Sequence, residues 1–511
     1  MDPSSEGAPP VRRPGLVRSS GGISLLAGTG VVAGFLVDAA MAALFGAGAR
    51  TDAFFIAATI PFSLAAVFLA SANQALVPLL NSWFNEEEPE VAVARSGGLL
   101  GAALVVGGAI TVLGVALSPV LAWVIAPGSS EGTKELATRI SVLLFLTVTT
   151  RVGAEVLRAV LNARFSFLAP AAMPIVENAA VLATMLALSP SMGVMAIPTG
   201  YVIGGFLQLA FMWAMVARSG LRLRPGWGFR DPAIRRGFRL LGLPIAGTGL
   251  NTLGRATERF LVSFLAPGSI TILNYAWVVV NSLGGTVFFR SVVVALLPRL
   301  SEAKRDLART RTTLYDGVRV MGLISMPLTG LTIVLASPLV SFAFQRGQFG
   351  ADDSRALAVV LAVYALVFPL DALTRALLSY FYARLDMATP FVNGFIGVSL
   401  TIVLAAALFW PLGVPGVALA YVLASTGNLV HAYVRVRRRT DLQAGPILPF
   451  LLKVLIASSA GAVVAYGVLV ALPDLMSFVG RSVSLAVPGL FGLLAVLMTL
   501  YLLRVRPGRI R

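Results

Sequence analysis

Long runs of apolar residues, separated by short polar loops, follow one another along almost the whole chain of 511 residues. A helix of about 20 apolar residues is long enough to cross a hydrocarbon core of about 30 Å. Fourteen runs reach this length, so the pattern predicts fourteen transmembrane helices. They begin near Gly22, Ala53, Gly97, Leu136, Phe167, Val194, Leu240, Ile272, Val318, Ala356, Phe391, Val414, Ile447 and Ser482.

Composition points to the same class of protein. Hydrophobic residues make up 57% of the chain and charged residues only 12%, far from the balance of a soluble domain. We therefore predict an all-α polytopic membrane protein, with the lipid bilayer as its solvent.

Short motifs recur at a constant offset of 220 residues. Residues 75–78 (Ala-Leu-Val-Pro) return as 295–298 (Ala-Leu-Leu-Pro), and Ala163-Arg164 returns as Ala383-Arg384. Each copy holds six predicted spans, an even number, so both copies enter the membrane in the same direction. The repeat predicts two six-helix lobes in parallel orientation, facing each other across a substrate path, plus two C-terminal helices.

The repeat and the loops between spans set the predicted domain boundaries. They are a cytoplasmic tail at 1–21, an N-lobe at 22–218, a basic linker at 219–239, a C-lobe at 240–439, and the last two helices with a tail at 440–511. Pro225 and Pro232 limit any helix in the linker to short pieces, which we expect to lie at the cytoplasmic interface as an amphipathic element.

The formal net charge of +17 reflects topology. Arginines gather in the even-numbered loops, as at 218–239, 299–311 and 435–439, and in the tail at 504–511, whereas the odd-numbered loops hold few. This is the positive-inside pattern, and it places both termini in the cytoplasm. The arginines form no single patch interleaved with aromatic residues, so nucleic acid is not an expected partner.

Several kinds of chemistry are excluded by what the sequence lacks. There is no cysteine and one histidine, His431, which rules out disulfides, thiol catalysis and histidine-based metal sites. No phosphate-binding loop or nucleophile motif is present. We expect no enzyme activity and no cofactor, and we leave open a coupling cation, Na⁺ or H⁺.

Ionisable residues inside predicted spans are the functional candidates, because a charge in the membrane is costly unless it is paired or hydrated. Asp38 lies in span one, Arg255, Glu258 and Arg259 lie in span seven, and Arg290 lies in span eight. Arg255 and Arg259 are four residues apart and share a helical face. Asp38 and Glu258 occupy equivalent positions of the repeat, so two acidic groups are expected at the seam between the lobes.

Other charged residues have simpler interpretations. Arg151, Glu155 and Arg158 have the spacing of an ion-pair ladder along one helix, while the role of Glu177 is left open. Asp371 and Arg375 are expected to pair with each other. Asp52, with Thr51, is expected to cap the start of the second span.

Several segments resemble the MurJ (MviN) family of lipid II flippases. They are residues 45–55 (Phe-Gly-Ala-Gly-Ala-Arg-Thr-Asp-Ala-Phe-Phe), 268–276, 297–301, 344–349 and 381–386. The resemblance implies the fold of the multidrug, oligosaccharidyl-lipid and polysaccharide (MOP) exporter superfamily. It also implies a multi-pass protein of the bacterial inner membrane that moves a polyprenyl-diphosphate-linked precursor outward for peptidoglycan synthesis and cell shape. Cell-wall synthesis proteins are then possible partners.

The chain departs from the family at arginines that the resemblance assigns to the substrate cavity. Val31, Val37, Ala65 and Ala66 stand at the family's arginine positions, and Trp277-Val278 replaces an Asp-Arg pair. One hypothesis is that Arg255, Arg259 and Arg290 hold the diphosphate instead. Asp38 and Glu258 then either neutralise these arginines or bind the coupling cation. In the alternative, all five form structural ion pairs that lock the lobes.

The first functional hypothesis is lipid II flipping by alternating access. The departures keep three alternatives open. One is a flippase for another polyprenyl-linked glycan or a polyprenyl phosphate, and the second is a scaffold that no longer transports. The third is a cation-coupled exporter of small hydrophobic compounds, which would use Asp38 or Glu258.

Overall fold

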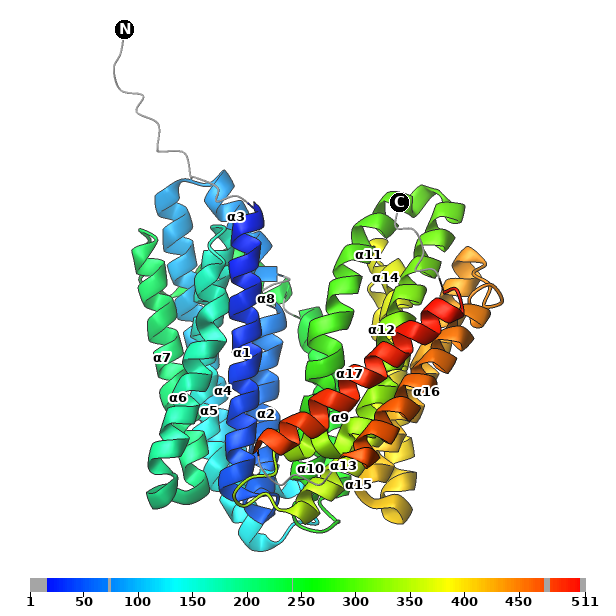
Figure 1. The fold of residues 1–511 in the computed structure, drawn as a ribbon. Coiled ribbons are helices and arrows are strands. Elements are labelled where there is room, and N and C mark those ends of the chain that lie inside the picture. Colours follow the sequence, from blue (N-terminus) through cyan, green and yellow to red (C-terminus); the bar gives the residue numbers. More distant parts are fainter. Residues whose placement is uncertain (1–15, 72–74, 241, 473–477, 506–511) are drawn as a thin grey trace.

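The computed structural model describes residues 16–71, 75–240, 242–472 and 478–505, and the regular secondary structure in these ranges is helical throughout (Figure 1). Residues 1–15 of the predicted tail at 1–21 lie outside the described residues. The first helix begins at Leu16, within the predicted tail. The α-helices are α1 (Leu16–Phe45), α2 (Ala49–Ser71), α3 (Val77–Glu86), α4 (Pro89–Ile125), α5 (Glu131–Ala163), α6 (Leu168–Met192), α7 (Ala196–Arg218), α8 (Pro232–Leu240), α9 (Gly242–Val262), α10 (Ser269–Val280), α11 (Arg290–Glu302), α12 (Leu307–Ala343), α13 (Ala351–Ala365), α14 (Val367–Ala383), α15 (Ala388–Thr440), α16 (Leu448–Ala471) and α17 (Phe478–Leu502).

The all-α membrane class is confirmed. Within the described ranges, ten helical stretches are long and apolar enough to span a bilayer. Two of them, Leu168–Arg218 and Ala388–Thr440, are 51 and 53 residues long and each covers two predicted spans. The count of fourteen stays a prediction.

Predicted spans seven and eight differ most from the simple pattern. Span seven is α9, whose three charged residues keep it out of the long apolar set. Span eight is divided into α10 and α11 by a π-helical segment, Asn281–Phe289. Wider turns of this kind are frequent at functional sites, and here the segment lies directly before Arg290.

Two glycines turn the chain at equivalent places in the repeat. Gly193 (φ +56°) separates α6 from α7, and Gly413 (φ +60°) breaks α15 into two legs. Positive φ strains any residue with a Cβ atom, so glycine is the residue suited to both turns. The 220-residue offset is thus visible in backbone conformation as well as in sequence.

The helices pack in two bundles. Helices α1–α7 contact one another in the first bundle, and α9–α17 do so in the second. Contacts between them come from α2 against α9 and α10, and from α4 against α9. The two bundles diverge toward the end of the molecule where α1 begins and α17 ends, which we call the divergent end (Figure 1). They meet at the opposite end, which we call the closed end.

Asp52 joins the bundles at the closed end. Its carboxylate accepts hydrogen bonds from the backbone N–H of Gly268 (2.6 Å), the N–H of Thr271 (2.8 Å) and the Thr271 hydroxyl (2.7 Å). Asp52 is only 5% exposed, so these bonds are shielded from water. The side chain caps α10 of the other bundle. The prediction that Asp52 caps its own helix was therefore wrong, while Thr51 does accept from the N–H of Gly48 at the start of α2 (3.0 Å).

Two further hydrogen bonds, each donated by a backbone N–H group, extend this seam. The Gln348 N–H donates to the Ala43 carbonyl (2.8 Å), and the Gly128 N–H donates to the Ser263 hydroxyl (3.0 Å). The loops after α1, α4, α9 and α12 therefore meet at the closed end. These contacts join the two bundles at the closed end.

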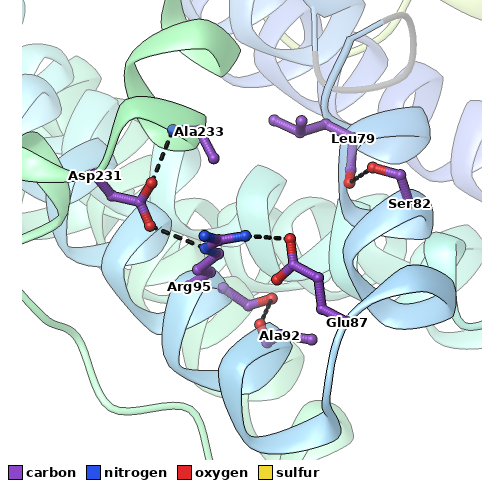
Figure 2. A network of polar contacts seen from close by, with 8 residues as sticks. Leu79, Ser82, Glu87, Ala92, Arg95, Asp231 and Ala233 are labelled. Atoms are coloured by element: carbon purple, nitrogen blue, oxygen red, sulfur yellow. Dashed lines mark hydrogen bonds and ion pairs between the residues drawn. The ribbon is translucent and has the colours of Figure 1, made fainter.

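The linker between the bundles is fixed to the first bundle. Arg95 of α4 pairs with Glu87 and, at 3.1 Å, with Asp231, whose carboxylate also accepts from the Ala233 N–H at the start of α8 (Figure 2). The linker folds into short pieces as predicted, a 3₁₀ turn at Gly228–Arg230 and the nine-residue α8. Ile234 of α8 is buried at 1% exposure.

Glycines of α4 allow the linker to approach closely. The Gly226 N–H donates to the Gly97 carbonyl (3.2 Å), and a Cβ on Gly101 would lie 2.1 Å from the Gly226 carbonyl oxygen. Gly101→Ala is therefore expected to detach the linker, because the clash is with backbone that cannot rotate away. We expect trypsin to cleave the arginine-rich segment 219–239 several-fold faster in this variant.

Gly108→Ala is the matched control, since it lies on the same helix and a Cβ added there would meet no atom within 4 Å. Cleavage at the parent rate in Gly101→Ala, with the control also unchanged, contradicts the proposed packing role of Gly101.

Candidate functional site

The charged residues of α9 lie against the first bundle. Arg259 donates from Nη1 to the Thr59 hydroxyl of α2 (2.7 Å) and from Nη2 to Asn274 Oδ1 of α10 (3.4 Å). One guanidinium therefore connects three helices from both bundles. The Thr59 hydroxyl itself donates to backbone carbonyls of α2, at Phe55 or Ile56, so its oxygen is free to accept from Arg259.

Arg255 lies one turn away on the same face and is exposed. Its guanidinium carbon is 5.9 Å from the centre of the Trp277 ring, within range for a cation–π contact. Trp277 packs edge-on against Tyr421 (5.2 Å) and Tyr364 (6.0 Å). An aromatic cluster of the second bundle thus supports one side of Arg255 and leaves its N–H groups available.

Glu258 lies in the electrostatic field of both arginines. Among the described residues it forms no ion pair at contact distance. The α9 group therefore combines two basic side chains and one acidic side chain without a direct ion pair between them. Within the described ranges neither arginine is locked to an acid, in contrast to the ion-pair alternative.

Arg290 is the first residue of α11 and is exposed. Within the described ranges it forms no ion pair with the acid of α9. Since α11 begins directly after the π-helical segment, a change in that segment would move Arg290. Its proposed part in substrate binding remains a prediction.

Asp38 of α1 lies on the first-bundle side of the seam and is partly buried. It forms no ion pair within the part of the chain that the structure describes. It does not neutralise Arg255 or Arg259 in this conformation.

At one pair of equivalent positions in the repeat, the acidic and basic residues are exchanged between the two bundles. Arg151 and Glu155 of α5 stand 220 residues before Asp371 and Arg375 of α14, so the basic and acidic positions are exchanged. Tyr201 and Tyr421 are likewise equivalent. The constant offset had already matched Tyr201 with Tyr421 in the sequence, whereas the charge-reversed pairs were overlooked, although the same offset could have revealed them.

The two pairs are used differently. Asp371 and Arg375 bond to each other at 3.2 Å, as predicted. In the first bundle Glu155 forms an ion pair with Arg158 (2.8 Å), whereas Arg151 forms one with Glu177 of α6 (2.6 Å). The expected ladder along α5 is thus confirmed at one step only, and Arg151 also covers the Phe62 ring at 4.7 Å.

The chemistry of this seam is that of binding. Two guanidiniums four residues apart can hold a phosphate or diphosphate through charge-assisted hydrogen bonds. Within the described residues no cluster of three His, Cys, Asp or Glu side chains is placed to hold a metal ion. The arrangement suits recognition of an anion between the two bundles.

Comparison with known proteins decides the family. The family model described as "Lipid II flippase MurJ" matches residues 41–484. The chain belongs to the lipid II flippase MurJ family. Among the curated relatives is a probable lipid II flippase MurJ of Vibrio cholerae, 28% identical over 417 residues that cover 79% of each chain. Another, from Rhizobium meliloti, is 26% identical over 485 residues, covering 92% of this chain and 89% of that protein.

Solved structures confirm the MurJ fold. A "Lipid II flippase MurJ, inward closed conformation" superposes with a TM-score of 0.81 at 21% identity, covering 95% of this chain and 99% of that one. An inward-facing multidrug resistance MATE family transporter of the MOP superfamily gives 0.63 at 13% identity, covering 80% and 98%. The MATE likeness shows that this transporter shares the overall fold.

At two of the positions where the family resemblance places charged residues, the side chain packs against other groups of this chain. Val37 is only 2% exposed within the apolar core, and Trp277 belongs to the aromatic cluster beside Arg255. Ala66 and Val31 are exposed. None of these four side chains carries a charge.

Proposed function

We propose that this protein is a lipid II flippase of peptidoglycan synthesis. Its cargo is the polyprenyl-diphosphate-linked precursor, carried from the inner to the outer leaflet of the bacterial plasma membrane. The observation that carries the proposal is the MurJ family match over residues 41–484. The α9 arginines at the bundle boundary, which form no ion pair among the described residues, support it.

The proposed topology has both termini in the cytoplasm, with an N-lobe at 22–218, a linker at 219–239 and a C-lobe at 240–439. The divergent end then faces the cytoplasm. The headgroup enters between the lobes from this side while the polyprenyl tail stays in lipid. No covalent bond is made or broken, so the protein acts as a transporter without a catalytic step.

In this mechanism Arg255 and Arg259 bind the diphosphate, and Arg290 joins them as the lobes move. The Arg259–Thr59 bond spans the two bundles, so a phosphate that captures Arg259 also removes one contact between them. Binding of cargo is thereby coupled to separation of α2 from α9. The lobes then open at the closed end, where the Asp52 contacts must break.

Asp38 and Glu258 are the proposed sites for a coupling cation, Na⁺ or H⁺. Both are carboxylates inside helices, at equivalent positions of the repeat, and neither has a direct ion-pair partner among the described residues. A bound cation would offset the cost of keeping such a charge in the membrane.

A second candidate keeps the fold and changes the cargo. Val37 and Trp277 stand where the family resemblance places charged residues, which favours another polyprenyl-linked glycan or a polyprenyl phosphate. A scaffold that does not transport would share the fold, but its function would not depend on the α9 arginines.

Replacement of an endogenous lipid II flippase tests the proposal. With this chain as the only flippase in a depleted bacterium, we expect growth and cell shape to be restored. Membrane accumulation of the protein, measured in parallel, controls for expression. Full accumulation without growth would contradict lipid II as the cargo and leave the second candidate.

A further inference from the structure

A cavity of about 530 Å³ lies at the divergent end of the second bundle, outside the seam described above. It forms where α12 begins and α15 ends. Its lining residues, which we call the arginine pocket, are Leu307, Arg311, Val434, Arg437, Arg438, Arg439, Thr440 and Asp441. The volume falls within the range of about 300–1,000 Å³ that is usual for small-molecule sites.

The pocket is held in shape by contacts between α12 and the loop after α15. Arg311 donates from Nε to the Thr440 carbonyl. The Tyr315 hydroxyl donates to the Gln443 carbonyl (2.9 Å) and accepts from the Gln443 N–H (3.2 Å). The loop is therefore fixed to the first turns of α12, and the terminal nitrogens of Arg311 remain available.

Positive charge in the pocket is not balanced. Arg437, Arg438 and Arg439 are exposed, and no acidic side chain in the described ranges pairs with them. Asp441, the only acid in the lining, accepts from the Gln443 side-chain amide (3.0 Å). Four guanidiniums thus face one carboxylate.

The repeat does not reproduce this cluster at the matching positions of the first half. The equivalent residues of the first bundle, 217–219, read Ala-Arg-Ser, and Val91 stands at the position of Arg311. The two halves enter the membrane in the same direction, so a topological signal would serve both equally. At these equivalent positions the first half has a single arginine, Arg218, whereas the second half has four.

We propose that the arginine pocket binds the phosphate-bearing headgroup of an anionic glycerophospholipid. Arginine is the side chain best suited to phosphate, because its planar fork donates two hydrogen bonds in parallel. Leu307 and Val434 give the lining an apolar portion for the glycerol and upper acyl carbons. Basic pockets at helix ends lie at the level of lipid headgroups, and on the proposed topology this leaflet is the cytoplasmic one.

The site is separate from the seam where cargo is proposed to bind. It depends on the protein lying in a membrane and on the pocket residues. Loss of this site would leave the cargo proposal intact, and failure of flippase rescue would leave this site intact.

Native mass spectrometry of the purified full-length chain in detergent tests the site, with dioleoyl-phosphatidylglycerol titrated against dioleoyl-phosphatidylcholine. We expect preferential binding of the first phosphatidylglycerol. Each basic residue near an anionic headgroup strengthens binding by roughly fivefold, so Arg437→Gln, Arg438→Gln, Arg439→Gln together should weaken this first event about 100-fold.

The matched control removes the same charge from the linker, as Arg222→Gln, Arg236→Gln, Arg239→Gln. It should keep the affinity of the parent, and the thermal midpoint without added lipid should confirm that both variants are folded. Equal losses in both triple variants, or no loss in either, would overturn the proposal. Displacement of the bound lipid by equimolar inorganic pyrophosphate would also overturn it, since the pocket would then select a soluble anion.

Discussion

Arg255→Ala with Arg259→Ala is expected to abolish growth rescue in a strain that has this chain as its only lipid II flippase. Hydrogen bonds to charged groups contribute about 1.5–3 kcal/mol each. Loss of two phosphate-binding guanidiniums should therefore slow transport by roughly 10²- to 10⁴-fold. Colony formation after depletion of the endogenous flippase measures the result.

The controls separate charge from function. Arg299→Ala with Arg305→Ala removes the same formal charge from exposed positions at the end of α11 and should leave rescue intact. Arg255→Lys with Arg259→Lys keeps the charge but loses the planar fork, and we expect partial rescue. Full activity of the double alanine variant, at normal membrane abundance, would remove both arginines from the mechanism.

Asp52→Ala is expected to release the closed end. The substitution deletes three buried hydrogen bonds and leaves the N–H groups of Gly268 and Thr271 unsatisfied. A net loss of about 3 kcal/mol shifts the balance toward molecules open at this end about 100-fold. Transport should fall, because a protein that no longer closes this end cannot alternate.

Cross-linking can measure this shift, because the chain has no cysteine of its own. The pair Ala43→Cys with Gln348→Cys lies where the two backbones bond across the seam at 2.8 Å. We expect rapid disulfide formation in the parent and much slower formation in Asp52→Ala. Asp306→Ala, which removes the cap of α12 far from the seam, is the control. Unchanged cross-linking in Asp52→Ala would show that Asp52 does not hold the closed end.

The fold could be predicted from the sequence because bilayer thickness imposes a length on every spanning helix. The apolar runs therefore identified the all-α class, and the 220-residue offset revealed the duplication. Span eight shows the limit of this reasoning, since its average composition is apolar while its backbone contains a π-helical segment at Asn281–Phe289. Hydropathy responds to composition and carries no information about such a break.

The site was predicted less completely, because partners across the seam are far apart in sequence. The cost of a charge in the membrane marked Arg255 and Arg259 as candidates, and their role in binding stays a prediction. The bond from Arg259 to Thr59 joins residues 200 positions apart, and Asp52 caps a helix that begins more than 200 residues later. No local pattern specifies such pairs. For Arg151, an acid at helical spacing suggested Glu155, while tertiary packing brought Glu177 within 2.6 Å.

The central claim is that this MurJ-family chain carries lipid II outward through a path lined by the α9 arginines. The most direct test is to label lipid II at the outer face of cells whose endogenous flippase is depleted. The account predicts outward labelling with the parent chain and none with the Arg255→Ala, Arg259→Ala variant at equal abundance. Equal labelling with both chains, or none with the parent, would contradict it.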